Sequence, residues 1–289
     1  MTRTMNCVDI GRRLALHCAL ALTLVAFSAA MCQATFITFE AAGADAAAIA
    51  PTRDAFRTAV GGGTVAGANG SFGGLRREIN WDGVPDARSD PNAFPADFFN
   101  VNSPRGVVFS TPGTGFLVSA NAGQPTPILF GFPNDFQAFS AQKLFTAVNS
   151  NITDVNFFVP GTTTPTTTSA FAAIFNDVEV AGVAKIEFFD QSNALIFNRE
   201  VLVGGNQGFS FLGGVANAGE KIGRVRITSG LNTIVSNGVL GNPDDDVVVM
   251  DDFLYAEPVA VAEPSSLLLA GLGLCALGLS RVRRRRAGA

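Results

Sequence analysis

The chain has 289 residues, of which 47% are hydrophobic, and a formal net charge of −4. This length suits one large domain or two small ones, with enough apolar residues for a packed core. The four cysteines and the one histidine all lie before residue 35 or after residue 258. The segment between them therefore has no disulfide, no Cys or His zinc site and no catalysis through histidine or a thiolate.

Charge is also divided unevenly along the chain. Of the 20 basic residues, three precede residue 35 and five follow residue 258, whereas only two of the 24 acidic residues lie in these end segments. Residues 35–258 thus hold 12 basic and 22 acidic residues, a formal charge of −10. Such a domain repels phosphate backbones, so we expect no nucleic-acid partner.

The N-terminal segment has the layout of a secretory signal peptide. Arg12 and Arg13 precede an apolar stretch over residues 14–30, and Cys32 and Ala34 place small residues at the −3 and −1 positions of a cleavage site. We therefore expect signal peptidase to remove residues 1–34. The alternative is an uncleaved membrane anchor.

Residues 35–258 contain a series of β-rich stretches with Gly, Asn and Pro between them. This pattern predicts one all-β domain, an antiparallel β-sandwich of jelly-roll-like type. A Thr-Pro-Gly sequence within 105–120 predicts a hairpin, and residues 190–193 predict a turn. The expected strands lie within 35–39, 105–120, 152–160, 169–180, 184–203, 209–215, 221–230 and 244–258.

Three further segments of this domain have a distinct composition. One short helix is expected at Pro51–Val60, with the proline in its first turn and Gly61 after its end. The glycine-rich run Gly61–Gly74 reads as a flexible loop. The threonine run Thr162–Ser169 is too polar for the core, so we expect a surface loop, and an O-glycosylated loop is the alternative.

The segment Arg76–Phe99 is a candidate ligand-binding loop because it holds the one tryptophan. Trp81 can stack on a sugar ring while Asp82 and the arginines Arg76 and Arg77 hydrogen-bond its hydroxyls, which predicts a polysaccharide site. The alternative, which we favour, is that Trp81 caps the core and the arginines pair with aspartates.

Carboxylate pairs in the same loop could hydrolyse a glycoside without histidine. Asp82 with Asp86 or Asp97 is such a pair, but the sequence does not fix the separation that catalysis needs. We therefore expect a domain without catalytic activity, and a carboxylate-dependent glycan-acting enzyme is the alternative function.

The last strand-like stretch contains a candidate metal site. Strict alternation puts Asp251 and Asp252 on opposite faces, and both faces are apolar, so at least one carboxylate should be buried. Glu40, after the first strand, can join Asp251 or Asp252 in a calcium site by analogy with β-sandwich modules. The favoured alternative is a strand-end acid bonded to backbone amides or to an arginine.

The C-terminal segment combines an apolar run with a basic cluster. Residues 265–280 carry no charge and predict a hydrophobic helix of about 24 Å, short of the roughly 30 Å membrane core. Arg281 and Arg283 can extend it by snorkelling, and the arginines would stay on the cytoplasmic side. The alternative is a buried core helix that ends in a solvated basic patch.

The order of features in residues 261–289 resembles the PEP-CTERM sorting signal of exporting bacteria, a Pro-Glu-Pro-like motif before an apolar segment and a basic cluster. Glu263 and Pro264 match the last two motif positions, whereas Ala262 stands where the first proline is expected. The basic cluster comprises Arg283, Arg284, Arg285 and Arg286. The resemblance implies recognition and cutting by an exosortase, a membrane cysteine peptidase, and a link to extracellular polysaccharide or biofilm.

These expectations describe an exported protein of the cell envelope or extracellular matrix, in three parts. Residues 1–34 are the signal peptide, residues 35–258 the β-sandwich and residues 259–289 the sorting tail. The tail anchors the chain in the membrane, either transiently before cleavage or as a permanent single-pass anchor. The domain is expected to be a binding or structural module for polysaccharide, with calcium as its one candidate cofactor.

Overall fold

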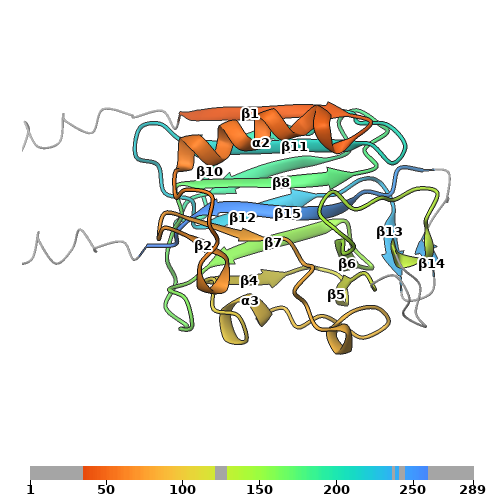
Figure 1. Ribbon diagram of the computed structural model, residues 1–289, viewed down its shortest axis with the longest axis horizontal. Coiled ribbons are helices and arrows are strands. Elements are labelled where there is room, and N and C mark those ends of the chain that lie inside the picture. Colours follow the sequence, from red (N-terminus) through yellow and green to blue (C-terminus); the bar gives the residue numbers. More distant parts are fainter. Residues whose placement is uncertain (1–34, 121–128, 236–237, 241–244, 260–289) are drawn as a thin grey trace, which may run out of the picture.

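The computed structural model describes residues 35–120, 129–235, 238–240 and 245–259, with side chains omitted for 238–240. The predicted signal peptide and residues 260–289 of the predicted tail, with Glu263, Pro264 and the arginine cluster, lie outside the described residues. Within the described ranges the chain is an all-β sandwich of two largely antiparallel sheets (Figure 1). The prediction of a β-sandwich is confirmed at this level.

The larger sheet has ten strands over the described ranges. Its main path runs through β1 (Phe36–Gly43), β11 (Phe209–Ala216), β8 (Ala170–Asn176), β15 (Val249–Ala256), β6 (Phe145–Val148), β13 (Thr233–Val235) and β14 (Gly238–Leu240). Three strands lie off this path: β3 (Arg76–Ile79) pairs with β15, β2 (Ser71–Phe72) with β3, and β5 (Gly115–Val118) with β6. The pairing of β13 with β6 is parallel.

The smaller sheet has five strands. Their order is β10 (Leu195–Glu200), β9 (Lys185–Phe189), β12 (Arg224–Thr228), β7 (Ile152–Phe157) and β4 (Val107–Ser110). The turn predicted between β9 and β10 is confirmed, because the Asn193 amide donates to the Asp190 carbonyl at 3.0 Å.

The predicted hairpin within 105–120 is wrong. β4 pairs with β7 in the smaller sheet, whereas β5 pairs with β6 in the larger one. The Thr-Pro-Gly segment therefore carries the chain from one layer of the sandwich to the other. Both flanking runs are buried strands, and their spacing alone does not tell a hairpin from a crossing between sheets.

The main helix, α2 (Ala46–Val60), is longer than predicted. Asp45 caps it by accepting the Ala48 amide at 3.0 Å, and Gly61 ends it with φ 89°. Pro51 thus lies in the second turn, not the first. The alanines before it are strong helix formers, and they extend the helix across the proline. The other helical segments are α3 (Phe98–Val101) and the 3₁₀ turns η1 (Ala68–Gly70), η2 (Asp86–Arg88) and η3 (Leu129–Gly131).

The threonine run is partly buried, which corrects the predicted surface loop. Thr166, Thr167 and Thr168 are at most 1% exposed. The Thr168 hydroxyl donates to the Ala256 carbonyl at 2.7 Å. Hydroxyl groups become compatible with burial when backbone carbonyls accept from them, and composition alone does not reveal such partners.

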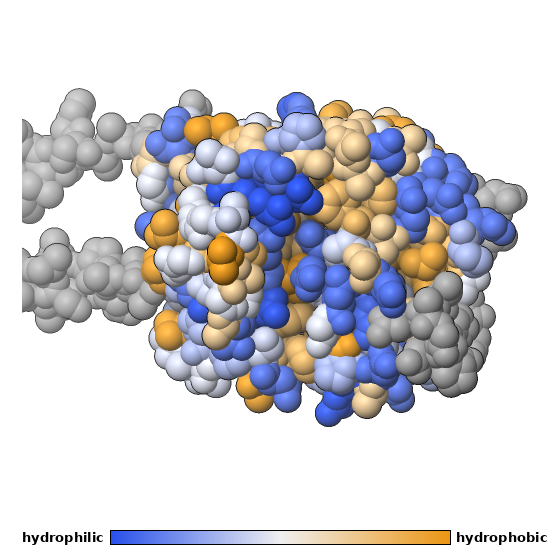
Figure 2. Space-filling model, in the orientation of Figure 1, coloured by the Kyte–Doolittle hydropathy of each residue, from blue (hydrophilic) through white to orange (hydrophobic). Residues whose placement is uncertain are grey.

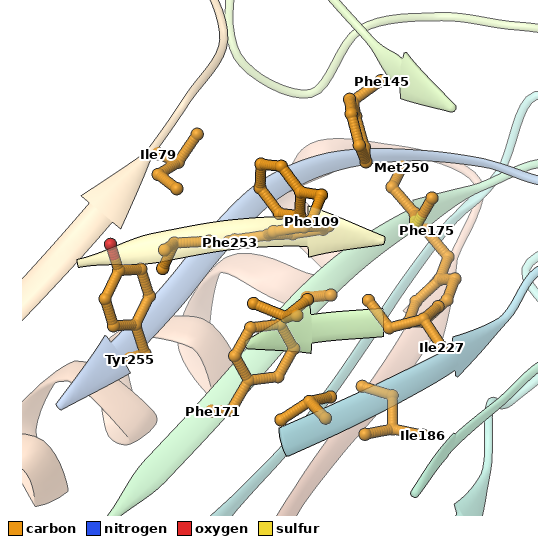
Figure 3. Close-up of a cluster of buried hydrophobic side chains, with 14 of the residues drawn as sticks. Ile79, Phe109, Phe145, Phe171, Phe175, Ile186, Ile227, Met250, Phe253 and Tyr255 are labelled. Atoms are coloured by element: carbon orange, nitrogen blue, oxygen red, sulfur yellow. The ribbon is translucent and has the colours of Figure 1, made fainter. Parts of the chain in front are cut away.

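An aromatic core fills the space between the sheets (Figure 3). Phe109 of β4 meets Phe145 of β6 and Phe253 of β15, with ring centroids 5.1 and 6.1 Å away. Phe171, Phe175, Tyr255 and the isoleucines of β9 and β12 continue the same cluster. These contacts hold the inner face of the larger sheet against the smaller sheet.

Two separate covers protect the outer face of the larger sheet. Helix α2 lies across β1 and β11 (Figure 1) and buries Ile49 and Phe56. Gly213 of β11 permits this close approach, since an added Cβ would lie 3.0 Å from the Phe56 ring. Residues 129–144 cover the other part with a second cluster around Phe136 and Leu144. The gap between these two covers positions the site described next.

Candidate functional site

A β-bulge in β15 forms the floor of the site. Met250 pairs with Phe175 and Phe253 with Ala173, so Asp251 and Asp252 together oppose one residue of β8. Met250 and Phe253 therefore both face the core between the sheets, and the alternation of faces shifts by one residue. The prediction that Asp251 and Asp252 point to opposite faces is wrong for this reason.

Both carboxyl groups instead meet one serine from the second cover. Ser140 Oγ lies 3.0 Å from Asp251 Oδ1 and 3.0 Å from Asp252 Oδ1. The Phe139 amide donates to Asp251 Oδ2 at 2.6 Å. The two aspartate side chains are hydrogen-bonded to each other and are 0% and 5% exposed.

Burial sets the protonation of this pair. It raises the pKa of Asp251 well above its usual value, and the neighbouring Asp252 charge raises this pKa further. Burial also raises the pKa of Asp252 to about 6, against the lowering effect of its hydrogen bonds to Asp251 and Ser140. Both carboxyl groups therefore keep a proton to higher pH than an exposed aspartate does, and they titrate as a pair.

Trp81 supports the bulge from the core side. Its indole Nε1 donates to the Asp251 carbonyl at 2.7 Å, and its ring stacks on Phe145 at a centroid distance of 4.0 Å. The side chain is 1% exposed, so the prediction that it stacks on a sugar is wrong. The favoured alternative, in which Trp81 belongs to the core, is confirmed.

The two arginines of the predicted binding loop are also structural. Arg76 is 2% exposed and pairs with Glu78 at 2.7 Å, while its other nitrogens donate to carbonyls of the glycine-rich loop. Arg77 pairs with Glu257 at 2.7 Å and donates to the Asn69 carbonyl at 3.1 Å. Their partners are glutamates, not the predicted aspartates, and together they hold the loop 61–74 against β3.

Asp82 lies beside the site. Its carboxylate accepts the Lys143 amide and the Asn80 side-chain amide, each at 3.2 Å. Lys143, which is fully buried, donates from Nζ to Asp86 and to Ser89 and so ties down the loop around Asp82. The predicted constellation of Trp81, Asp82 and the two arginines is therefore a scaffold.

The predicted calcium ligands do not converge. Glu40 lies on β1, three strands and about 14 Å from β15, and pairs with Arg199 through oxygen–nitrogen distances of 2.6 and 2.8 Å. Both oxygens of Asp251 already accept or share hydrogen bonds. In the described ranges no three acidic, histidine or cysteine side chains are placed to hold a metal ion. Glu40 thus does not join Asp251 and Asp252 around one ion, and calcium as a cofactor stays a prediction.

The Asp252 carboxyl opens onto a cleft of about 790 Å³ between α2, the glycine-rich loop and Ser140. Figure 2 shows hydrophilic residues gathered in a hollow on this face of the molecule. One wall is a stripe of α2 formed by Ala46, Ala50, Arg53 and Arg57. The opposite side presents Gly67, Asn69, Gly70 and Phe72 of the loop, and the floor presents Glu78, Asn80, Arg105 and Asp252.

The charged groups of the cleft are mostly paired. Arg57 contacts both oxygens of Glu78, at 2.9 and 2.6 Å. Arg53 pairs with Asp54 at 2.9 Å and lies over the Phe139 ring at 5.1 Å. Sequence reasoning missed Glu78, Arg57 and Ser140, because segments far apart in the chain bring them together. The two consecutive acids inside an apolar strand were the available signal.

The comparisons with known proteins add little. No family model and no curated protein matches the chain. Among solved structures, the chain is similar to the enzymatically active domain of tailspike protein 4 from bacteriophage CBA120, at 12% identity and with a TM-score of 0.22. The match covers 57% of this chain and 20% of the tailspike chain. A likeness at this level carries no argument about function.

Among the described helices, none has the length and hydrophobicity to cross a membrane.

Proposed function

We propose that this chain is an exported protein of the cell envelope or extracellular matrix, sorted by exosortase through its PEP-CTERM-like tail. In this proposal its β-sandwich binds polysaccharide in the α2 cleft without turning it over. The jelly-roll-like type of the sandwich and the hydrophobic C-terminal helix belong to the same proposal. The observation that carries the binding function is the cleft itself.

The shape of the cleft suits an extended chain. Its α2 wall repeats at residues 46, 50, 53 and 57, the spacing of one helix face, and spans about 16 Å. Its lining also combines donors and acceptors such as Asn80 and Ser140 with the aromatic residues Phe72 and Phe139. Convergent polar groups beside aromatic rings are what hydroxylated, ring-shaped ligands require.

One observation favours a glycan-acting enzyme as a second candidate. Asp252 faces the cleft with a pKa of about 6, which suits a general acid, and Glu78 is a second carboxylate on the same floor. Arg57 and Arg76 hold Glu78 in ion pairs, however, and a paired carboxylate is a poor nucleophile or base. We therefore place binding before catalysis.

A blocking substitution tests the proposal. Ala50 lies in the α2 stripe and is partly buried, so Ala50→Trp would fill the cleft. Ala55 is exposed on α2 outside the stripe, and Ala55→Trp is the matched control. We expect calorimetry against a panel of soluble polysaccharides to find a binder whose affinity falls at least tenfold in Ala50→Trp and is unchanged in Ala55→Trp.

The same titrations separate the alternatives. Release of shorter saccharides during incubation would establish the enzyme, and equal binding by Ala50→Trp and wild type would place the ligand outside the cleft. Absence of any binder in the panel would overturn the binding function. Melting with and without a chelator tests calcium, since a bound ion raises the melting temperature only while it is present.

A further inference from the structure

Arg105 differs from the other arginines near the cleft because it has no carboxylate partner. Arg53, Arg57, Arg76 and Arg77 each form an ion pair of 3.1 Å or less. Within the described part of the chain, no acidic group lies within 4.0 Å of Arg105. A guanidinium on the cleft floor is thus left without its counter-charge.

The contacts of Arg105 hold it in place and leave one of its nitrogens without a protein acceptor. Its Nε donates to Ser103 Oγ at 3.3 Å, and its Nη1 donates to the Glu78 carbonyl. Its guanidinium lies over the Phe99 ring at 4.8 Å. Nη2 has no acceptor among the described residues, although Arg105 lines the cleft.

The surroundings of Arg105 oppose its charge. Burial lowers the pKa of Arg105, an effect that the Tyr255 hydroxyl counters and that the nearby Arg77 charge reinforces. Arg105 is half-buried, and partial burial of a charge without a counter-charge is costly. A guanidinium binds carboxylates through its planar fork of N–H groups. The missing counter-charge can therefore be supplied by an anionic ligand.

The loop beside Arg105 leaves room for this side chain. Gly70 has φ 64°, and an added Cβ there would lie 2.6 Å from Arg105 Nη1 and 2.4 Å from the Glu78 carbonyl oxygen. The glycine therefore permits the loop to pack against the edge of the guanidinium that carries Nη1.

From this geometry we propose that Arg105 anchors a carboxylate of the bound saccharide, so that the cleft favours saccharides that carry a uronic acid over their neutral counterparts. The inference rests on the proposed binding function and names its ligand class. Arg105 contacts the carboxylate directly, while Ser103 and Phe99 orient the guanidinium.

A matched pair of probes tests the selection. Oligogalacturonate carries one carboxylate per sugar, and its fully methyl-esterified form has the same backbone without the charge. We expect calorimetry to give at least tenfold tighter binding of the acid form, since hydrogen bonds between charged groups are worth about 1.5–3 kcal/mol. Arg105→Gln should lower the affinity for the acid form to that of the ester and leave the ester unchanged.

Two further variants complete the design. Arg88 is exposed and outside the cleft, so Arg88→Gln removes the same charge from the domain and should bind both probes like wild type. Arg105→Lys keeps the positive charge but loses the planar fork of N–H groups, so it should retain part of the preference for the acid form over the ester. Thermal unfolding identifies a variant that does not fold. The comparison of the acid and ester probes on wild type tests the preference for a carboxylate without any variant.

The outcomes separate this inference from the function on which it rests. Equal binding of the acid and ester forms by wild type would overturn the role of Arg105 and leave polysaccharide binding intact. A preference for acid that survives in Arg105→Gln would also overturn it. Binding of neither probe, nor of any polysaccharide in the panel, would overturn the proposed function itself.

Discussion

At the scale of single residues, the acid pair gives the most informative chemistry of the molecule. Two consecutive aspartates lie on one side of a bulge, share Ser140 and bury both carboxyl groups. Two carboxylates this close cannot both ionise cheaply, so one of them holds a proton. The same arrangement that shapes the cleft floor also makes the stability of the fold depend on pH.

The pKa of Asp252 fixes the sign of that dependence. It is about 6 in the fold, whereas the ordinary value is 3.8. Between about pH 4 and pH 6 the folded chain keeps a proton that the unfolded chain has lost, so this contribution to stability is complete below the window and is lost as the pH rises through it. The side chain in Asp252→Asn cannot ionise. We therefore expect the free energy of unfolding of this variant, relative to wild type, to rise by on the order of 3 kcal/mol between pH 4 and pH 7.

Urea unfolding of both proteins at pH 4 and pH 7 measures this gain. Burial also raises the pKa of Asp177, to about 7, but Asp177 is present in both proteins and its contribution cancels in the difference. Asp97 is exposed, so Asp97→Asn should show no comparable gain. If the free energies of unfolding of Asp252→Asn and wild type differ by the same amount at pH 4 and pH 7, the raised pKa of Asp252 is wrong.

At the scale of elements, the strands were predictable and their partners were not. Alternation and β-branched composition located β1, β7, β8, β9, β11, β12 and β15. The short strands β2, β3 and β6 gave too few residues for a pattern. The bulge at Asp251 was missed because alternation assumes an unbroken ladder, and only the register with β8 shows where it breaks.

The start of helix α2 gives a prediction at this scale. Asp45 accepts the Ala48 amide, one of the amides that the first turn leaves without a partner. Asp45→Ala should therefore lower the free energy of unfolding by about 1 kcal/mol, and Asp45→Ser should restore most of it. Denaturant titrations measure both, and an Asp45→Ser variant as unstable as Asp45→Ala would show that the cap is not the cause.

At the scale of the whole molecule, the series of β-rich stretches predicted the class of the fold but not the site. The hydrophobic fraction of 47% indicated a packed core, and phenylalanines contribute much of the core that forms. The cleft instead depends on residues from α2, the glycine-rich loop, β3, Ser140 and β15, which meet only in the folded chain. For Trp81 the sequence left two interpretations open, because an aromatic ring suits a core as well as a sugar site, and its burial in the folded chain confirms the favoured one.

The first and the last described residues lie at the same end of the sandwich, which bears on how the chain is processed. β1 starts and β15 ends at the same end of the sandwich (Figure 1). The Asn217 amide donates to the Thr35 carbonyl, and Thr167 and Val259 form a bridge nearby. Under the proposed sorting, the signal peptide and the tail therefore attach to one end of the sandwich.

Cysteine content provides a test of that processing, because all four cysteines lie in the two end segments. Cys7, Cys18 and Cys32 precede the predicted cut after Ala34, and Cys275 lies in the apolar part of the tail. The full-length chain has four thiols, a chain that loses only the signal peptide has one, and a chain that loses both segments has none. We expect the exported protein, reduced and unfolded, to take up no maleimide by intact mass measurement and to begin at Thr35. One adduct would establish a permanent anchor, and four adducts would show that neither end is processed.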